Sequence, residues 1–238
     1  MKILCLIPAR SGSKGIQHKN IKFLSGKPLM AYSIEQAQQC KYNMRIIVST
    51  DSEDYAKIAR HYGAETPFLR PSKISQDLST DYEFIEHALG ELKNENYIPD
   101  FIVQLRPTYP TRTVEILNDT IRIFKEKRDS YDSLRTVIPF DKSPFKMYRI
   151  ENNTLEPLFR EVNGIKEPYN QCRQNLPNTY LHNGYIDILN TNIVKNGYIS
   201  GEKIYPYLMT GDEYHDIDYE NDFKKVEDIL NIYAKKKC

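Results

Sequence analysis

Short apolar runs alternate with helix-like patterns through the amino-terminal half of this 238-residue chain. The runs lie at Ile3–Ile7, Arg45–Thr50 and Asp100–Leu105, and the first is apolar at every position, as expected of a strand buried on both faces. Such alternation is typical of βαβ units. The sequence therefore predicts an α/β fold, built on a mainly parallel sheet that is flanked by helices.

Helix signals fill the gaps between these runs. Ser52–Tyr62 carries apolar residues at helical spacing, and Gly63 follows it as a natural stop. Thr80 and Glu83 form a capping box that opens a second helix, and a third is expected to begin near Thr113. Further along the chain, the expected elements are strands at Leu181–Leu189 and Lys203–Met209 and an amphipathic helix at Asn221–Tyr233.

The composition and patterning of the sequence change after about residue 139, where a polar stretch without a long helical pattern begins. It is punctuated by Pro139, Pro144, Pro157, Pro168 and Pro177. We interpret 139–180 as an excursion from the sheet, a hairpin-like arm inserted into a single domain that spans 1–238.

Composition excludes several classes of function. The chain has 33 Lys+Arg against 32 Asp+Glu, a net charge of +1, which argues against a general nucleic-acid binder. No apolar run approaches the roughly 20 residues that a membrane-spanning helix needs. Cys5, Cys40, Cys172 and Cys238 show no C-x-x-C spacing, so neither a zinc site nor a redox motif is expected. These features suggest a cytoplasmic protein.

The first apolar run leads directly into a glycine-rich loop, Pro8-Ala9-Arg10-Ser11-Gly12-Ser13-Lys14-Gly15. In open α/β sheets, ligands bind beyond the carboxyl ends of the strands, where this loop is expected. Gly12 and Gly15 permit close approach of the backbone, and Arg10 and Lys14 add two positive charges, a combination that suits a nucleoside triphosphate. The alternative is a turn with two exposed cations. The pattern matches neither the Walker nor the dinucleotide-binding glycine motif.

A pair of carboxylates lies near the other end of the chain, at Asp216 and Asp218 on either side of Ile217. In an extended segment both would point to one face, with their Cα atoms about 6.6 Å apart. Their mutual repulsion would be relieved by a cation, and Mg²⁺ favours one or two carboxylates together with phosphate oxygens and water. The alternative is an exposed acidic turn.

These blocks, taken in order, resemble the CMP-sialic acid synthetases (acylneuraminate cytidylyltransferases), which are related to the cytidylyltransferase that activates the sugar KDO. The resemblance covers nearly the whole chain. It rests on the glycine loop with Lys19-Asn20, Ile47–Ser52, Tyr62–Glu65, Pro67–Pro71, Arg106–Arg112, Arg173–Pro177, Asn183-Gly184 and Asp216–Asp218. It implies a Rossmann-like nucleotidyltransferase sheet, and a homodimer formed through the 139–180 arm.

The resemblance also implies an activity: CTP and a nine-carbon α-keto acid sugar would give the CMP-sugar and pyrophosphate, with Mg²⁺ as cofactor. Arg10, Lys14, Arg173, Asp216 and Asp218 would be catalytic, and the two aspartates would be the metal ligands. The implied nucleotide-binding residues are Ala9, Arg10, Ser11, Gly12, Ser13, Lys14, Gly15, Asn20, Arg70, Thr80 and Arg106. Those implied for the sugar are Arg106, Arg173, Gln174 and Asn183.

Several of these residues have a second explanation. Thr80 is also accounted for as a helix cap, Arg70 as a surface cation, and Arg173 as one half of a surface ion pair. The chain also departs from the family pattern, because Arg106 replaces a glutamine and Leu181 an arginine that meets the sugar in bacterial members, while His182 replaces a usual proline. Positive charge would thus have moved within the pocket.

These departures lead us to expect a modified nonulosonic acid of the legionaminic or pseudaminic type as the acceptor, in preference to N-acetylneuraminic acid. Two alternatives stay open: an enzyme of this fold with another acceptor such as KDO or another nucleotide, and a catalytically silent nucleotide-binding protein. The transferase hypothesis requires that the cationic glycine loop and the distant acidic pair face one crevice.

Overall fold

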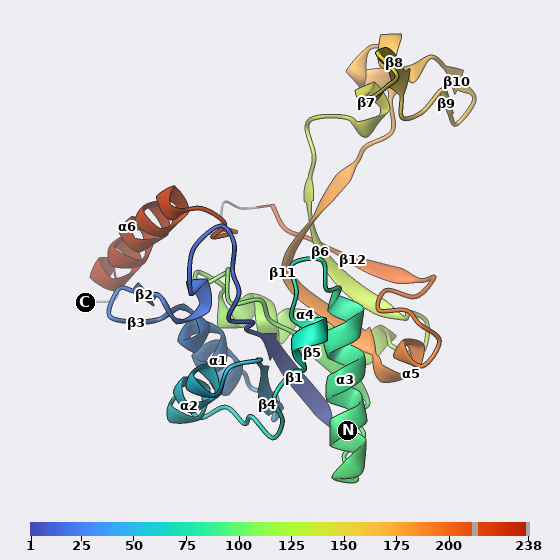
Figure 1. Ribbon diagram of the computed structural model, residues 1–238. Coiled ribbons are helices and arrows are strands. Elements are labelled where there is room, and N and C mark those ends of the chain that lie inside the picture. The colour runs from blue at the N-terminus through green and yellow to red at the C-terminus, as the bar shows by residue number, and fades with distance from the viewer. Residues whose placement is uncertain (211–213, 237–238) are drawn as a thin grey trace. The chain divides into compact units, whose positions relative to one another are not determined.

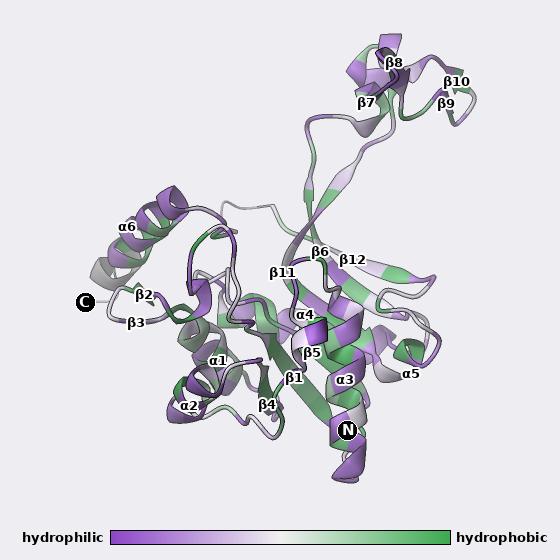
Figure 2. Cartoon of the chain, viewed as in Figure 1, coloured by the Kyte–Doolittle hydropathy of each residue, from purple (hydrophilic) through white to green (hydrophobic). Residues whose placement is uncertain are grey.

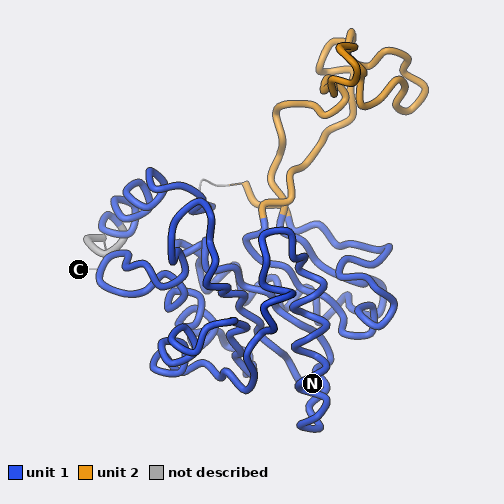
Figure 3. The backbone as a smooth tube through the Cα atoms, in the orientation of Figure 1, with its two compact units in different colours: residues 1–136, 184–207, 211–238 blue, residues 137–183, 208–210 orange. Residues whose placement is uncertain are grey.

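The computed structural model describes residues 1–210 and 214–236 (Figure 1). The chain divides into two compact units (Figure 3). Unit 1 holds Met1–Thr136, Gly184–Tyr207 and the described residues after position 213, and unit 2 holds Val137–Asn183 and Leu208–Thr210. The proline-punctuated stretch 139–180 lies within unit 2. Its part in a dimer stays a prediction.

Six strands form the main sheet in the order β12-β6-β11-β5-β1-β4. β1 (Ile3–Pro8) pairs in parallel with β4 (Arg45–Ser49) on one side and with β5 (Phe101–Gln104) on the other. β11 (Tyr180–Asn190) runs antiparallel to β5, and the sheet is completed by β6 (Ser133–Pro139) and β12 (Ile204–Leu208). The mainly parallel sheet predicted from the sequence is confirmed.

Helices pack on both faces of this sheet. On one face, α3 and α5 bury residues against Leu4, Leu6 and Ile102. On the other, Phe124 of α4 meets Phe101, the strand neighbour of Ile102, with ring centroids 5.4 Å apart. The helices are α1 (Leu29–Gln39), α2 (Glu53–His61), α3 (Asp81–Asn94), α4 (Val114–Lys127), α5 (Thr191–Val194) and α6 (Glu220–Lys236). Figure 2 shows apolar residues concentrated along the central strands.

Side-chain caps explain where three helices begin. The hydroxyl groups of Ser52 and Thr113 accept hydrogen bonds from the third residue beyond them, at the start of α2 and α4 respectively. The capping box predicted at α3 is present, because the backbone N–H of Thr80 donates to the Glu83 carboxylate at 2.5 Å. Gly63 follows α2 with φ of +90°, a conformation that L side chains rarely adopt.

Among the longer elements, α1 and β6 were not predicted from the sequence. α1 has eight buried residues out of eleven, including Ser33 and Gln36, so it presents no polar stripe by which a surface helix is recognised. The apolar pattern of β6 is interrupted by Arg135, which pairs with Asp187 of β11 at 2.9 Å. The strands and helix expected late in the chain are present as β11, β12 and α6.

Arg112 fastens the loop after β5 to its surroundings. Its buried guanidinium donates to the Tyr185 carbonyl at 2.8 Å, to Gln36 Oε1 at 2.8 Å, to Ser33 Oγ at 3.1 Å and to the Arg106 carbonyl at 2.8 Å. Burial lowers the pKa of Arg112 to about 10, so the group stays charged near neutrality. The loop is therefore tied to both α1 and β11 by one side chain.

Shorter elements complete the two units. Unit 1 also holds a ribbon of β2 (Phe23–Leu24) and β3 (Lys27–Pro28) and the 3₁₀ turns Lys19–Ile21 and Ser72–Ile74. Unit 2 holds the ribbons β7 (Tyr148–Glu151) with β8 (Thr154–Pro157) and β9 (Glu161–Val162) with β10 (Ile165–Lys166), and the 3₁₀ turns Pro144–Lys146, Pro168–Asn170 and Arg173–Asn175.

The described residues bear on two expectations from the sequence, one about membrane-spanning helices and one about the cysteines. None of the helices within 1–210 and 214–236 is long and apolar enough to cross a membrane. Cys5, Cys40 and Cys172 are free thiols, and Cys238 lies outside the described residues.

Candidate active site

A cleft of about 430 Å³ lies where β1 and β5 end. Because these strands are parallel, the loops that follow them meet at one edge of the sheet, the usual ligand position in α/β folds. The cleft is lined by the glycine loop, the segment before α3, the loop after β5 and the segment before α6. Of the residues predicted to form the site, the cleft brings together Arg10, Ser13, Lys14, Gly15, Asn20, Arg70, Thr80, Arg106 and Asp218.

The glycine loop meets Asp218 of the acidic pair in this cleft, whereas Asp216 is not among the described residues that line it. A Cβ atom added at Gly15 would lie 2.6 Å from the Asp218 carbonyl oxygen, so the close approach requires glycine there. Lys19 Nζ donates to the Ile217 carbonyl at 2.8 Å and lies 3.2 Å from Asp218 Oδ1. Two segments about two hundred positions apart therefore share one site, as the transferase hypothesis requires.

Burial of Ile217 holds the acidic pair in place. Ile217 is fully buried, whereas Asp216 and Asp218 on either side of it are exposed, the alternation of an extended segment. Its side chain belongs to an apolar cluster with Ile16, which directly follows the glycine loop, and Phe223 from α6. Its backbone N–H donates to the Thr108 carbonyl at 3.0 Å.

The two carboxylates have different surroundings. Asp216 accepts side-chain hydrogen bonds from Thr108 and Tyr109. Lost hydration raises the pKa of Asp216, assisted by repulsion from Asp218 and opposed by those hydrogen bonds and by Lys19. Asp218 faces Lys19 instead, and its backbone N–H donates to Asp222 Oδ2 at 3.0 Å.

This donor set fits Mg²⁺. Within the described part of the chain, no group of three or more His, Cys, Asp or Glu forms a metal cluster. Two carboxylates beside a loop suited to phosphate are what Mg²⁺ takes when phosphate oxygens and water complete its shell. Asp216 and Asp218 are the residues that would hold it.

The predicted loop cations already have an internal partner. Arg10 Nη1 lies 2.9 Å from Asp77 Oδ1, and Lys14 Nζ lies 2.7 Å from Asp77 Oδ2. The sequence analysis gave Asp77 no role, and no local signal ties it to the glycine loop more than sixty positions earlier. Tyr109 was missed for the same reason, whereas Asp222, which was also missed, accepts hydrogen bonds from backbone groups only three and four positions before it.

Other loop residues brace the backbone. The buried Ala9 donates its N–H to the Ser49 carbonyl at 2.9 Å, and Ser11 donates its N–H and its hydroxyl to Asp51 at 2.7 and 2.8 Å. Asn20 donates to the Arg10 carbonyl at 3.0 Å from a position that also lines the cleft. Gly12 lies in open space, with nothing within 4 Å of an added Cβ. Ala9 and Ser11 thus support the shape of the loop, and their contact with a nucleotide stays a prediction.

Arg70 is a buried wall of the cleft, so its interpretation as a surface cation is wrong. It is 5% exposed and donates to Ser49 Oγ at 3.0 Å and to the Ser49 carbonyl at 2.6 Å, with its guanidinium carbon 4.8 Å from the Phe84 ring centroid. Burial lowers the pKa of Arg70 to about 10, so it remains charged at neutral pH. Thr80 caps α3 and lines the cleft as well, so its two explanations are compatible.

Comparison with known proteins identifies the family. The cytidylyltransferase family model matches residues 4–229. The chain belongs to the cytidylyltransferase family. It is 34% identical to a CMP-N,N'-diacetyllegionaminic acid synthase of Legionella pneumophila, over 98% of this chain and 97% of that protein. It is 32% identical to an N-acylneuraminate cytidylyltransferase of Escherichia coli O18:K1:H7, over 99% of this chain, which spans 53% of that protein.

A solved structure supports the fold assignment. The structure of CMP:2-keto-3-deoxy-manno-octonic acid synthetase complexed with CTP matches 98% of this chain and 100% of its own chain, with a TM-score of 0.70 and 13% sequence identity. This cytidylyltransferase therefore has the nucleotidyltransferase sheet expected from the sequence.

Arg106, the departure from the family glutamine, does not bring free charge into the cleft. It forms ion pairs with Asp81 at the start of α3 and with Asp187 of β11, and donates to the Gly184 carbonyl at 3.1 Å. Burial alone would lower the pKa of Arg106, but attraction to Asp187 and Asp81 outweighs it and raises the pKa above the usual value. The expectation that positive charge moved to this position is corrected: the charge is compensated internally.

The residues predicted for the sugar other than Arg106 belong to unit 2. Arg173 and Gln174 lie in the 3₁₀ turn Arg173–Asn175, and Asn183 lies in β11 and donates to Met209 Sδ at 3.3 Å. Arg173 Nη2 is 3.4 Å from Asp141 Oδ1, and both side chains are exposed, so the pair holds the guanidinium weakly. Sugar binding by these residues stays a prediction.

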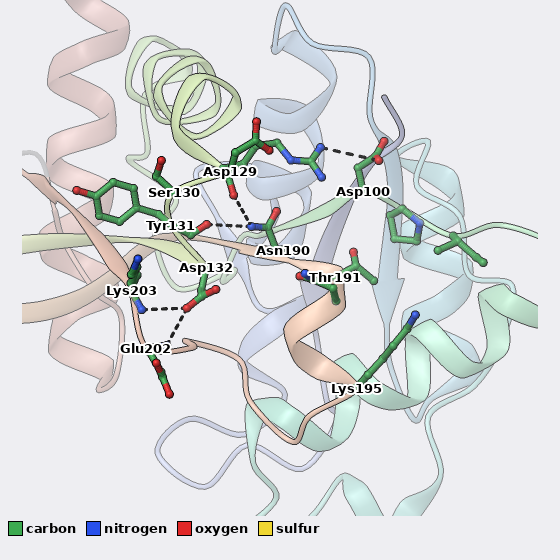
Figure 4. Close-up of a pocket in the computed structure, with 14 residues that line it drawn as sticks. Asp100, Asp129, Ser130, Tyr131, Asp132, Asn190, Thr191, Lys195, Glu202 and Lys203 are labelled. Carbon is green, nitrogen blue, oxygen red and sulfur yellow. Dashed lines mark hydrogen bonds and ion pairs between the residues drawn. The ribbon is translucent and has the colours of Figure 1, made fainter.

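A larger hollow of about 670 Å³ lies where β5, β6 and β12 begin (Figure 4). Two of its polar side chains bond within the fold. Asp132 Oδ2 accepts from the backbone of Glu202 and Lys203 at 2.8 and 2.9 Å, and Asn190 donates to the Arg128 and Tyr131 carbonyls. Among its described lining residues are none of those predicted for catalysis or binding.

We predict that Arg106→Gln, which restores the family residue, destabilises this protein by about 2–4 kcal/mol, because it takes the counter-charge from Asp81 and removes one of the two arginines that pair with the buried Asp187. Adding Asp81→Asn to this variant should recover about 1 kcal/mol or more of coupling energy. Denaturant unfolding of the two single variants and the double variant measures both effects.

The matched control is Arg122→Gln, which removes exposed ion pairs to Asp119 and Glu126 on α4. Its cost should stay below about 1 kcal/mol. If Arg106→Gln lowers the free energy of unfolding no more than Arg122→Gln does, the ion pairs of Arg106 with Asp81 and Asp187 do not stabilise the loop after β5.

Proposed function

We propose that this cytidylyltransferase transfers CMP from CTP to a nonulosonic acid, giving the CMP-sugar and pyrophosphate. The observation that carries the proposal is the meeting of the cationic glycine loop and Asp218 of the acidic pair in one cleft, joined by Lys19. A triphosphate needs cations and backbone N–H groups on one side and a metal site on the other, and this cleft offers both.

The positive side chains would act electrostatically on the triphosphate. The anomeric hydroxyl of the sugar attacks the α-phosphorus and releases its proton to solvent. The bond to the pyrophosphate oxygen breaks, so negative charge accumulates on the leaving group. Arg10 and Lys14 on the glycine loop would neutralise that charge. Lys19 lies beside Asp218, so its ammonium group is placed to hold a phosphate oxygen between the loop and the acidic pair.

Asp216 and Asp218 would hold Mg²⁺, which polarises the phosphate that is attacked. The chain's own contribution is to keep the two carboxylates ionised and aligned. Thr108 and Tyr109 donate to Asp216 and favour its charged form, against the lost hydration that raises its pKa.

The nucleoside end of the cleft is firmly built. Arg70 and Phe84 form one wall, and Thr80 stands beside them at the start of α3. Arg70 is fixed through Ser49 and Arg106 through Asp81, so neither side chain loses much freedom when a ligand arrives. We assign this end to the cytidine.

The acceptor we propose is a nonulosonic acid of the legionaminic or pseudaminic type. Leu181 replaces the arginine expected two positions before Asn183, and alternation along β11 places these two side chains on one face. Because the charge of Arg106 is compensated by carboxylates, the charge lost at Leu181 is not regained there. An exposed leucine suits the deoxygenated, N-acylated parts of such sugars better than the hydroxyl-rich tail of N-acetylneuraminic acid.

We predict pyrophosphate release when the enzyme is given CTP, Mg²⁺ and a panel of sugar acids, with the highest kcat/KM for a legionaminic or pseudaminic type of acceptor. Fastest turnover of unmodified N-acetylneuraminic acid would contradict the acceptor assignment. Release only with KDO would identify a different sugar acid, and no release with any acceptor would leave a nucleotide-binding protein without this activity.

Asp218→Asn is expected to lower the rate of pyrophosphate release by about 100-fold or more, because a metal ligand beside the reacting phosphate is lost. Stability should change by less than about 1 kcal/mol, since the Lys19–Asp218 pair is exposed on the aspartate side. Steady-state kinetics and thermal unfolding separate the two effects. Asp54→Asn on α2 removes an equal charge outside the lining of the cleft and should leave the rate unchanged; an active Asp218→Asn enzyme would remove the metal assignment.

We further propose that a second copy of this chain covers the ribbon of β7 and β8 in unit 2. Ile150 and Leu155 face each other across the ribbon and are 75% and 60% exposed, and the exposed Leu158 and Phe159 follow at its end. Apolar side chains gathered in this way mark an interaction surface. Four large apolar residues within ten positions support the dimerisation role predicted for 139–180.

Light scattering at micromolar concentration should show a homodimer, and Ile150→Asp should shift it toward monomer because a charge would be buried at the contact. Ile98→Asp, at another exposed apolar position in unit 1, serves as the control and should remain dimeric. A wild-type protein that is a stable monomer would contradict the dimer.

A further inference from the structure

One carboxylate holds both cations of the glycine loop. Asp77 places Oδ1 2.9 Å from Arg10 Nη1 and Oδ2 2.7 Å from Lys14 Nζ, so each of its oxygens serves one cation. Hydrogen bonds from Lys14 and Arg10 hold the pKa of Asp77 below its usual value, so this group is ionised at neutral pH. The two cations proposed to receive the triphosphate are thus already paired.

The pairing draws the cations toward the segment before α3. Arg10 Nη1 also lies within hydrogen-bonding distance of the Ser75 carbonyl, at 3.4 Å, on the same segment as Asp77. Arg10 and Lys14 line the cleft, whereas Asp77 is not among its described lining residues. A polyphosphate in the cleft would therefore compete with Asp77 for the same two side chains.

The Asp77 segment is built so that it can release them. Gln76 and Ser79 bond to each other across Asp77, with the Gln76 N–H donating to Ser79 Oγ at 2.9 Å and the Ser79 N–H to the Gln76 carbonyl at 3.1 Å. Leu78 beside it is 94% exposed and contributes nothing to the core. The segment thus keeps its own shape without the cations, and freeing them breaks two partly exposed ion pairs and one long hydrogen bond.

We infer that Asp77 is an internal counter-ion of the triphosphate site: it holds Arg10 and Lys14 in the free enzyme, and an incoming polyphosphate displaces it. This inference rests on the proposed function and adds a residue that sets the affinity of that site. A polyphosphate carries several negative charges and prevails over one carboxylate, whereas an anion of low charge gains little by the exchange. Asp77 therefore lowers the affinity of the site for any anion that must displace it from Arg10 and Lys14.

The test replaces Asp77 by asparagine, which keeps the shape of the side chain and removes its charge. Asp77→Asn should lower the Kd for inorganic pyrophosphate by about threefold to tenfold, as expected when competition from two partly exposed ion pairs is lost. Binding of inorganic phosphate should also strengthen. In turnover, the KM for CTP should fall while kcat does not rise, because ground state and transition state gain equally.

Two controls isolate the effect. Asp54→Asn removes an exposed carboxylate from α2 and gives the same change in net charge, so its Kd for pyrophosphate should match the wild type. Asp77→Glu keeps the charge and should also bind pyrophosphate with nearly wild-type affinity. Isothermal titration calorimetry of the folded full chain measures all four proteins.

The outcomes distinguish this inference from the proposed function. If the wild type binds pyrophosphate and CTP but Asp77→Asn binds them equally or more weakly, Asp77 orients the cations or has no role, and the inference is overturned while the proposed function stands. If Asp54→Asn lowers the Kd for pyrophosphate as much as Asp77→Asn does, the effect comes from net charge alone, and the inference is overturned too. A wild type that binds neither ligand overturns both proposals.

Discussion

The site depends on the burial of one side chain, Ile217. Between two carboxylates that must reach a polar cleft, the chain places an isoleucine that packs against Ile16, directly after the glycine loop, and Phe223 of α6. Full burial of such a side chain is worth about 1.5–3 kcal/mol, and an extended backbone then turns both neighbours the other way. The hydrophobic cluster under the site thus fixes the distance between the phosphate loop and the acidic pair, and Gly15 permits the closest contact.

Cations around the cleft fall into two groups. Arg10, Lys14 and Lys19 each pair with a carboxylate at the surface, and such pairs are weak enough to be exchanged for ligand oxygens. Arg70 and Arg112 are buried and donate to carbonyl and side-chain oxygens, so they act as fixed parts of the scaffold. Arg106 shares features of both groups: it lines the cleft, as the first group does, and its two carboxylate partners keep it in place, as in the second. The contrast separates the charges that ligands can recruit from those that hold the walls.

Much of the fold could be read from local signals. Apolar runs predicted β1, β4 and β5, helical spacing of apolar residues predicted α2 and α4, and the capping box at Thr80 predicted the start of α3. These signals depend on neighbours within a few positions. α1 was missed because tertiary burial of nearly all of it removes the polar stripe that periodicity needs. Arg70 was left open for a similar reason, since burial of an arginine beneath a loop depends on partners that the sequence does not reveal.

The sequence alone determined the chemistry available: a cationic glycine loop after the first strand and a pair of carboxylates two positions apart, in an α/β chain with blocks resembling those of the cytidylyltransferases. Such features are local, because residue type and short spacing decide them. Tertiary structure decided which charges face one another: Asp77 with Arg10 and Lys14, and Asp81 and Asp187 with Arg106. Those pairings join residues 25 to 81 positions apart, and only the packing of strands and loops at one edge of the sheet brings them within range of an ion pair.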